Sequence, residues 1–169
     1  MARESNNTNR PDEIFDSIKT RLIASITQAT THNTYISTMP MEMPPNPDEI
    51  MFEISPGQNV GFDQPIMYGA GTASLHTIMQ ITVTVHITQQ KDESGRDDTY
   101  LRHATLGVFH LMRQILVALS IHDLADTSAN EQLSQPLHPV SGTIPPRDDR
   151  EAGYASVTFE ARFDWDMSA

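Results

Sequence analysis

Seven histidines are the residues of this chain best suited to metal or acid–base chemistry. They are His32, His76, His86, His103, His110, His122 and His138. A helix through His103 and His110 would place both on one face, and Asp123 follows His122, so a metal site of imidazole and carboxylate ligands can be imagined. Their spacing is too wide for two ligands on a straight helix to share one ion, and helix-surface histidines are commonly solvated. We expect no metal and no cofactor, and keep a histidine-dependent metal-binding enzyme as the alternative.

Carboxylates near the end of the chain form a second group of residues that could take part in catalysis. Glu160, Asp164 and Asp166 alternate with apolar residues, so in a strand they would share one face. Two carboxylates can act as general acid and base, but no partner residue or pocket pattern accompanies them. The sequence also lacks a glycine-rich phosphate loop, a Gly-x-Ser-x-Gly elbow and a His-Glu-x-x-His pair. We therefore expect a solvated sheet face and no catalytic residues.

The size and composition of the chain predict one domain that contains no disulfide. A chain of 169 residues with 38% hydrophobic content can fill one core. We expect a flexible N-terminal arm over residues 1–10 and a single domain over 11–169, with a proline-rich excursion at 38–48 and a long loop at 55–77. Cysteine is absent, which excludes a disulfide framework and a thiolate metal site.

The charge balance limits the possible partners. The formal charge is −11, from 22 acidic and 11 basic residues, which argues against tight binding of nucleic acid, because Lys and Arg supply that affinity. An acidic wall past which DNA slides is compatible with this charge, since repulsion prevents sticking. The polar N-terminus lacks the apolar core of a signal peptide and no apolar run could span a membrane. We expect a soluble protein, made in a cytoplasm, with no membrane partner.

Two helices are predicted from apolar residues at helical spacing. The first begins at Pro11, which suits a first helical turn, and continues to Thr30 with Ile14, Ile18, Leu22 and Ile26 on one face. The second extends from Thr99 to Ser120. Its main stripe consists of Leu101, Ala104, Val108, Leu111, Met112, Ile115 and Leu119, with Phe109 and Leu116 beside it.

Strict alternation of apolar and polar residues predicts strands at 79–88 and 155–166, because successive side chains of a strand point to opposite faces. A short strand over 49–54, ended by Ser55-Pro56-Gly57, and an edge strand over 137–142 complete the set. Strands that alternate have one wet face. The expected fold is therefore α+β: a single antiparallel, possibly mixed sheet with two amphipathic helices packed on one face, and long loops.

Three apolar residues, Leu106, Val117 and Ile121, lie close to one line on the polar side of the second predicted helix. Single exposed apolar residues are common, but a group of them indicates a second packing surface. We therefore predict a subunit contact through these three residues.

Several sequence segments, in their order along the chain, resemble the tail terminator and related head-tail joining proteins of tailed bacteriophages and prophages. The segments are the N-terminal amphipathic helix, the Ser55-Pro56-Gly57 turn, the strand 80–85, the helix end at 118–124 and the end of the final strand at 163–166. The resemblance extends from Pro11 to Trp165 and consists of the order of the elements and of short stretches of sequence, not of one diagnostic motif. The proline-rich excursion and the long loop depart from the smaller members of the family.

The resemblance implies a structural virion protein, made and assembled in the cytoplasm of a bacterial host. It implies a ring of identical copies, usually a hexamer, that caps the tail tube, joins it to the neck and lets DNA pass without sequence-specific binding. No cofactor and no catalytic residues follow from it. On this interpretation Glu160, Asp164 and Asp166 would face the lumen. Another head-tail connector or tail-completion subunit stays open, as does a monomeric adaptor or chaperone that binds its partner through the N-terminal arm.

Overall fold

The computed structural model describes residues 10–37, 50–62, 67–69, 72–87, 101–121, 124–126, 131–134, 136–145 and 153–166. The predicted N-terminal arm, apart from Arg10, and the predicted excursion 38–48 lie outside the described residues. No helix within the described ranges is long and apolar enough to cross a membrane.

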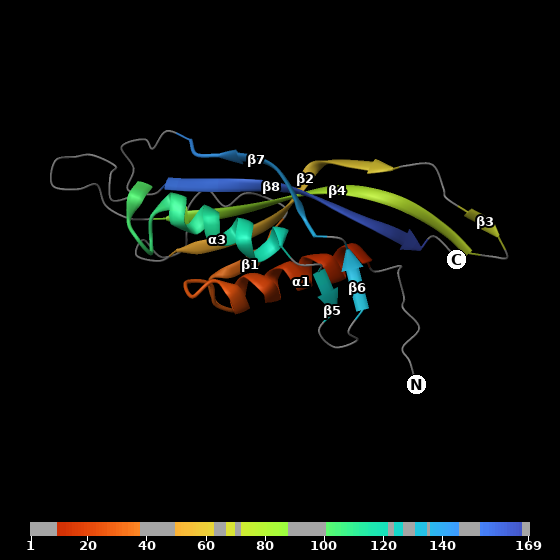
Figure 1. Cartoon of the computed structure of the whole chain (residues 1–169), viewed down its shortest axis with the longest axis horizontal. Coiled ribbons are helices and arrows are strands. Elements are labelled where there is room, and N and C mark those ends of the chain that lie inside the picture. The colour runs from red at the N-terminus through yellow and green to blue at the C-terminus, as the bar shows by residue number, and fades with distance from the viewer. Residues whose placement is uncertain are drawn as a thin grey trace.

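The fold is α+β, with an open six-stranded sheet and two helices among the described residues (Figure 1). The strand order is β1-β2-β4-β8-β7, and β3 also pairs with β4. All pairs in this sheet are antiparallel except β1–β2, which is parallel, so the sheet is mixed. Its strands are β1 (Thr34–Ile36), β2 (Met51–Phe62), β3 (Met67–Gly69), β4 (Thr72–Ile87), β7 (His138–Thr143) and β8 (Gly153–Asp166).

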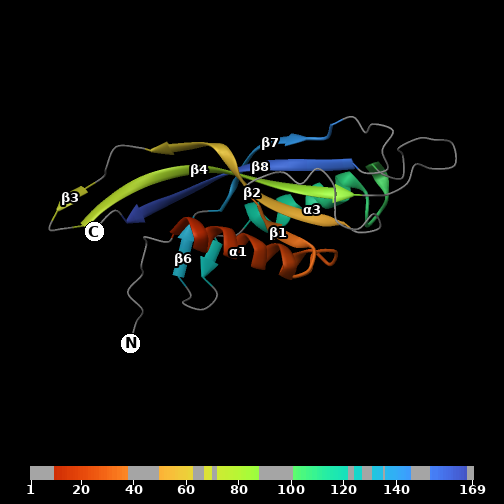
Figure 2. The same ribbon diagram turned by 180° about the vertical axis from the view of Figure 1, so that it is seen from behind.

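Both helices cover the same face of the sheet, as the front and back views show (Figures 1 and 2). Helix α1 (Arg10–Ser25) buries Ile14, Ile18 and Leu22 at four-residue spacing. Helix α3 (Val108–Ser120) buries its own apolar stripe beside α1. Below them lie the inward side chains of the strands: Phe52, Ile54, Ile81, Val83, Val85, Ala155, Val157, Phe159, Ala161 and Phe163. The predicted face of the closing strand is confirmed.

Helix α1 ends earlier than the sequence predicted. The prediction placed its end at Thr30, but the helix ends at Ser25 and turns follow. The side chain of Asn33 explains the difference, because its Oδ1 accepts a hydrogen bond from the amide of Thr30 (2.7 Å) and its Nδ2 donates to the carbonyl oxygens of Gln28 (2.8 Å) and Ile50 (2.9 Å). Side chains that bond the backbone in this way compete with helix formation, and the turn leads directly into β1.

The predicted helix from Thr99 to Ser120 is also wrong at its beginning. Leu101 and Arg102 are helical, but residues 103–107 form a turn before α3 begins at Val108. The imidazole Nδ1 of His103 accepts hydrogen bonds from the amides of Thr105 (3.3 Å) and Leu106 (3.2 Å), and Gly107 donates to the His103 carbonyl (3.0 Å). Local bonds of this kind stabilise a turn in place of a continuous helix.

Gly107 is required at this turn, and its replacement is expected to be costly. A Cβ at position 107 would lie 2.5 Å from the amide nitrogen and 2.7 Å from the carbonyl oxygen of His103, and backbone atoms cannot move aside cheaply. We expect Gly107→Ala to lower the free energy of unfolding by about 1–3 kcal/mol, measured by urea denaturation. Gly61→Ala is the control, because a Cβ there would have its nearest heavy atom at 3.8 Å. Equal stability of the two variants would contradict this prediction.

The predicted loop at 55–77 is mostly strand. Strand β2 continues through Ser55-Pro56-Gly57 to Phe62, β3 follows, and β4 already begins at Thr72. The register of β2 on β4 shifts between Pro56 and Val60, which is a β-bulge. Gly57 approaches Gln80 so closely that a Cβ would lie 2.4 Å from the Gln80 Cβ. The Gly and Pro residues thus mark a bulge and an edge position, where strands tolerate them.

This longer strand pair produces an arm that extends past the helices. The arm consists of the second half of β2, strand β3, the first half of β4 and the end of β8, and both views show it beyond the end of α1 (Figures 1 and 2). A small hairpin that the sequence did not reveal, β5 (Leu124–Asp126) with β6 (Glu131–Ser134), contacts α1. The arm is therefore the part of the sheet that the two helices do not cover.

Candidate functional site

The face of the sheet opposite the helices carries the polar side chains of β4 and β8. Gln80, Thr82 and Thr84 lie directly opposite Glu160, Thr158 and Ser156 in the β4–β8 register. The hydroxyls of Thr82 and Thr158 are 3.1 Å apart and hydrogen-bonded. Cross-strand polar pairs of this type stabilise a solvated sheet face.

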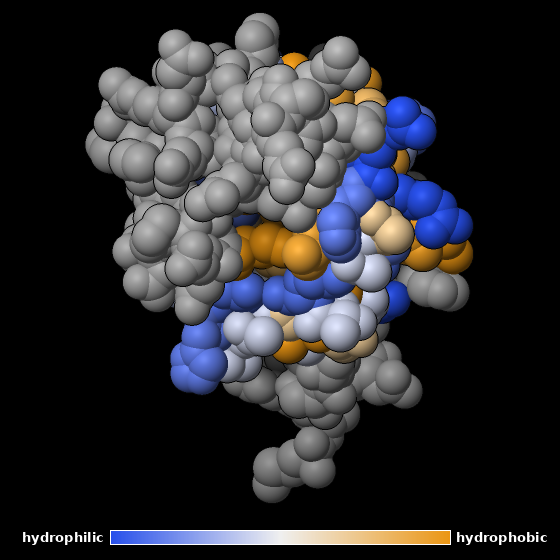
Figure 3. All heavy atoms as spheres, turned by 90° about the vertical axis from the view of Figure 1, so that its left-hand side faces the viewer, coloured by the Kyte–Doolittle hydropathy of each residue, from blue (hydrophilic) through white to orange (hydrophobic). Residues whose placement is uncertain are grey.

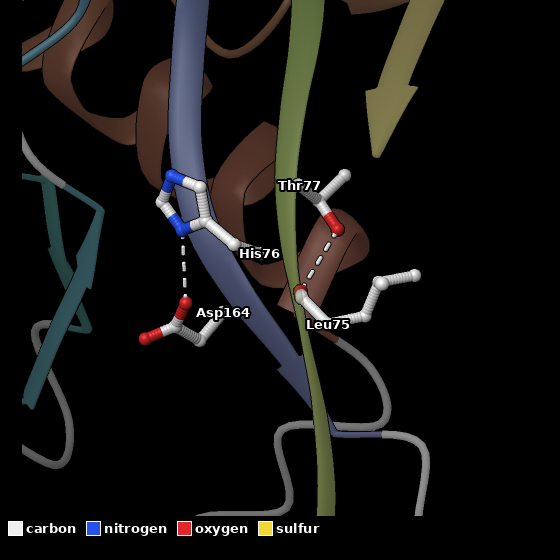
Figure 4. A network of polar contacts seen from close by, with 4 residues as sticks. All are labelled: Leu75, His76, Thr77 and Asp164. Carbon is white, nitrogen blue, oxygen red and sulfur yellow. Dashed lines mark hydrogen bonds and ion pairs between the residues drawn. The ribbon is translucent and has the colours of Figure 1, made fainter. Parts of the chain in front are cut away.

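Two of the acidic residues predicted on this face have a side-chain partner on the same face. Asp164 is paired with His76 of β4, with 3.0 Å between Asp164 Oδ1 and His76 Nδ1, and the two side chains point toward one another (Figure 4). Glu160 Oε2 lies 3.4 Å from Arg162 Nη2 on the same strand. Asp166 is the last residue of β8, paired with Ser74, and its side chain is outside the description. The face thus carries carboxylates that are paired with an imidazole and a guanidinium group. Its orientation toward a lumen stays a prediction.

A second imidazole–carboxylate pair lies on the same face and is buried. His86 Nε2 and Glu53 Oε2 are 3.0 Å apart, and their side chains are only 7% and 2% exposed. The ring of Tyr154, which is paired with His86 in the β4–β8 register, has its centroid 6.0 Å from that of His86. Buried polar groups need such partners, because an unmade hydrogen bond in the interior costs free energy. The Glu53–His86 pair therefore contributes primarily to the stability of the fold.

Sequence reasoning missed the Glu53–His86 pair, although a signal for it exists. In the predicted strand over 49–54, alternation places Ile50, Phe52 and Ile54 on one side and Glu53 on the other. His86 likewise falls on a polar position of its alternating strand. Only the antiparallel register of β2 and β4, which puts Met51 opposite His86 and Glu53 opposite Thr84, brings the two side chains together.

The structure does not bring the other histidines together as the metal hypothesis required. His103 lies in the turn before α3 and His110 in the helix itself, so the two do not share one straight helix. Nδ1 of His103 accepts backbone amides, and Nε2 of His110 is hydrogen-bonded to Gln114 Nε2 at 2.7 Å. His122 and Asp123 lie outside the described residues. Within the described ranges no three His, Cys, Asp or Glu side chains are placed to hold a metal ion.

A hollow of about 320 Å³ lies between α1 and α3. It is lined by Arg21, Ser25, Arg113, Gln114, Val117, Ala118 and Ile121. Val117 and Ile121 are exposed, as predicted for a contact surface. Leu106 is different: it is half-buried in the turn before α3 and does not line the hollow. The three residues therefore do not form one line on a helix, because the chain is not helical between His103 and Gly107. Their role as a subunit contact stays a prediction.

Exposed apolar side chains also occur at the beginning of α3. Phe109, predicted beside the core stripe, is 54% exposed. The space-filling view from the end where α3 begins shows a hydrophobic strip bordered by hydrophilic residues (Figure 3). Val117 and Ile121 thus line the hollow, whereas Phe109 is exposed at the beginning of α3, outside the hollow.

The arm leaves one strand edge without a strand partner among the described residues. β1 pairs with β2 only from Phe52 to Ile54, so the outer edge of β2 has no neighbouring strand toward Phe62 within the described ranges. On the other side of the arm, β7 pairs with β8 from Ser156 to Glu160, and β6 also contacts β8. Val60 and Phe62, on the open edge of β2, are 45% and 58% exposed. Unpaired edges with apolar side chains are templates for another chain.

No protein-family model matches this chain, and no curated protein sequence matches it.

Proposed function

We propose that this protein is a ring-forming structural subunit of a tailed-phage virion, of the tail terminator or a neighbouring head-tail joining type. The observation that carries the proposal is the arm, in which the outer edge of β2 toward Phe62 has no strand partner among the described residues and carries the exposed Val60 and Phe62. A protein that functions as a monomer usually shortens, charges or covers such edges. An open edge of this kind fits a contact with a second copy of the chain, and a head-to-tail contact closes into a ring when the rotation allows.

The polar sheet face supports passage of DNA through such a ring. Asp164 and Glu160 belong to a chain of formal charge −11, and carboxylates repel phosphate where an array of Lys and Arg would hold it. The charge pattern argues against tight DNA binding and is compatible with a wall that repels DNA. In this proposal the tube and neck proteins are the further partners, and the hollow between α1 and α3, with Val117 and Ile121 exposed, is available to them.

The test of ring formation is particle shape. Purified full-length protein is imaged by negative-stain electron microscopy and its mass is measured by sedimentation over a concentration series. We expect closed particles with a central hole and a mass that is a fixed multiple of 18.9 kDa. A strictly monomeric profile at high concentration would favour the adaptor alternative and contradict the proposal.

The acidic face gives a second testable consequence. Glu160→Lys with Asp164→Lys should leave the fold intact, because Asp164 is largely exposed and Glu160 only partly buried. Rings of this variant should retain double-stranded DNA at low salt and release it as salt rises, since the new lysines neutralise phosphates. The measurement is a gel-shift titration. The matched control is Asp12→Lys with Asp16→Lys, exposed positions on α1 that add the same charge on the helix side. Equal DNA retention by both variants would contradict the lumen assignment.

A further inference from the structure

We propose that the hollow between α1 and α3 binds an acidic segment of a partner protein, with a carboxylate held by its two arginines and an apolar side chain packed on Val117 and Ile121. The two helices that form the hollow contact one another (Figure 1). The inference goes beyond the proposed ring, because the hollow lies within one protomer and is present in a monomer as well.

Two guanidinium groups line the hollow, one from each helix. Arg21 belongs to α1 and Arg113 to α3. Arg113 is exposed, and among the described residues no side chain forms an ion pair or hydrogen bond with its guanidinium group. Arg21 takes part in another interaction of the chain, but a guanidinium group has five N–H donors, and one partner does not occupy them all. The hollow therefore has donors for an anion.

The hollow is a positive site in an acidic chain. The chain has 22 acidic and 11 basic residues, yet none of the described Asp and Glu residues lines the hollow. Like charges around one cavity repel one another, and a carboxylate placed between them removes that cost. At physiological salt the Debye length is about 8 Å, so the acidic charge elsewhere on the chain repels only weakly a ligand that contacts the arginines directly.

Neutral donors lie beside the arginines. The side chain of Gln114 is held by His110, with 2.7 Å between Gln114 Nε2 and His110 Nε2. Ser25 is exposed and lies one helical turn after Arg21 on α1, so both face the hollow. A hydroxyl and an amide group can each donate a hydrogen bond to a carboxylate oxygen that the arginines leave free. The donor set thus fits a carboxylate with two acceptor oxygens.

The remaining lining of the hollow is apolar. Val117 and Ile121 are 44% and 59% exposed, and they lie four residues apart at the end of α3. A hydrated inorganic anion gains nothing from such side chains, whereas a leucine or an aromatic side chain would remove their apolar area from water. The preferred ligand therefore combines a carboxylate and an apolar side chain in one short stretch.

The size of the hollow favours a peptide segment. Its volume of about 320 Å³ lies at the lower end of the range of about 300–1,000 Å³ for small-ligand sites. Nucleic acid fits poorly, because its binding depends on many Lys and Arg contacts along a phosphate backbone. An acidic peptide supplies both required groups, and the pairing of arginine with carboxylate is frequently bidentate, which adds specificity to charge.

The test uses full-length protein and three capped tetrapeptides. They are acetyl-Leu-Asp-Asp-Leu-amide, the neutral acetyl-Leu-Asn-Asn-Leu-amide and the less apolar acetyl-Ser-Asp-Asp-Ser-amide. Binding is titrated by saturation-transfer NMR of the peptide, which applies to a monomer and a ring alike. We expect saturable, millimolar or tighter binding of the Leu-Asp peptide, and binding weaker by at least about fivefold for the other two. Absence of saturable binding, or equal binding of the Leu-Asp and Leu-Asn peptides, would overturn the inference.

Substitutions locate the site on the protein. Arg113→Gln should weaken binding of the Leu-Asp peptide by at least about fivefold. Arg102→Gln removes the same charge from an exposed position outside the hollow and should leave binding unchanged. Val117→Ser should also weaken binding, and Phe109→Ser, at another exposed apolar position of α3, is its matched control. Unchanged binding by Arg113→Gln, or an equal loss in Arg102→Gln, would overturn the inference.

A competition experiment and electron micrographs separate this inference from its rivals. Inorganic phosphate at constant ionic strength should not displace the Leu-Asp peptide, and saturable displacement would assign the hollow to phosphate groups and overturn the inference. Rings that do not bind the Leu-Asp peptide would refute the acidic-segment site and leave the ring standing. A monomer that binds the peptide through Arg113 would support the site and contradict the ring.

Discussion

Replacing Phe159 with alanine is expected to lower the free energy of unfolding by about 3–5 kcal/mol, the range for large aromatic side chains removed from a core. Phe159 is fully buried on the helix face of β8, and it is paired with Ile81 of β4 on one side and Pro139 of β7 on the other. The substitution removes apolar area from the centre of the sheet and leaves a cavity that neighbouring strands cannot fill. A loss of this size is a large part of the stability of a typical domain.

The measurement is urea denaturation followed by circular dichroism, with the midpoint and slope fitted separately. Phe109→Ala is the matched control, because the same side chain is lost from a site that is 54% exposed. We expect that change to stay within about 0.5 kcal/mol, as for most surface substitutions. Equal losses for Phe159→Ala and Phe109→Ala would mean that the faces of the fold are assigned incorrectly.

Separation of the buried pair Glu53–His86 is expected to have an effect of similar size. His86→Leu should lower the free energy of unfolding by about 3–5 kcal/mol, because it removes the imidazole from a buried carboxyl group. The double variant Glu53→Met with His86→Leu should recover much of this loss, since apolar side chains of similar volume need no hydrogen bond. A double-mutant cycle from urea denaturation gives the coupling between the two positions.

The exposed pair His76–Asp164 is the natural comparison, because its nitrogen–oxygen distance is also 3.0 Å. Its side chains are 28% and 61% exposed, so water solvates each group when the other is removed. We expect His76→Leu to cost no more than about 1 kcal/mol. If both pairs showed the same coupling energy, burial would not be the reason for the strength of the Glu53–His86 pair.

Much of the fold could be predicted from periodicity. The alternation in 155–166 gave the strand and its buried face, including Phe159 and Phe163, because the side-chain period of a strand is fixed by its backbone. The four-residue spacing of Ile14, Ile18 and Leu22 likewise gave the buried face of α1. These features depend only on residues close together in the sequence.

The errors occur where a side chain bonds the backbone or where a distant strand lies alongside. The His103 imidazole and the backbone space around Gly107 end the predicted helix, and Asn33 ends α1 early. Pro56 and Gly57 indicated a loop, but β4 lies alongside and turns the segment into a bulged strand. Composition alone cannot distinguish a loop from a strand that bulges against a partner.

The sequence by itself determined the class of the fold, the faces of its helices and long strands, the absence of cysteine and the acidic charge, because all of these are properties of local pattern or composition. The tertiary structure decided the rest: the length of β2, its open outer edge in the arm, the burial of Glu53 with His86 and the separation of Leu106 from Val117 and Ile121. Each of these depends on which distant residues meet. The register between strands determines which distant residues meet, and no local spacing in the sequence encodes that register.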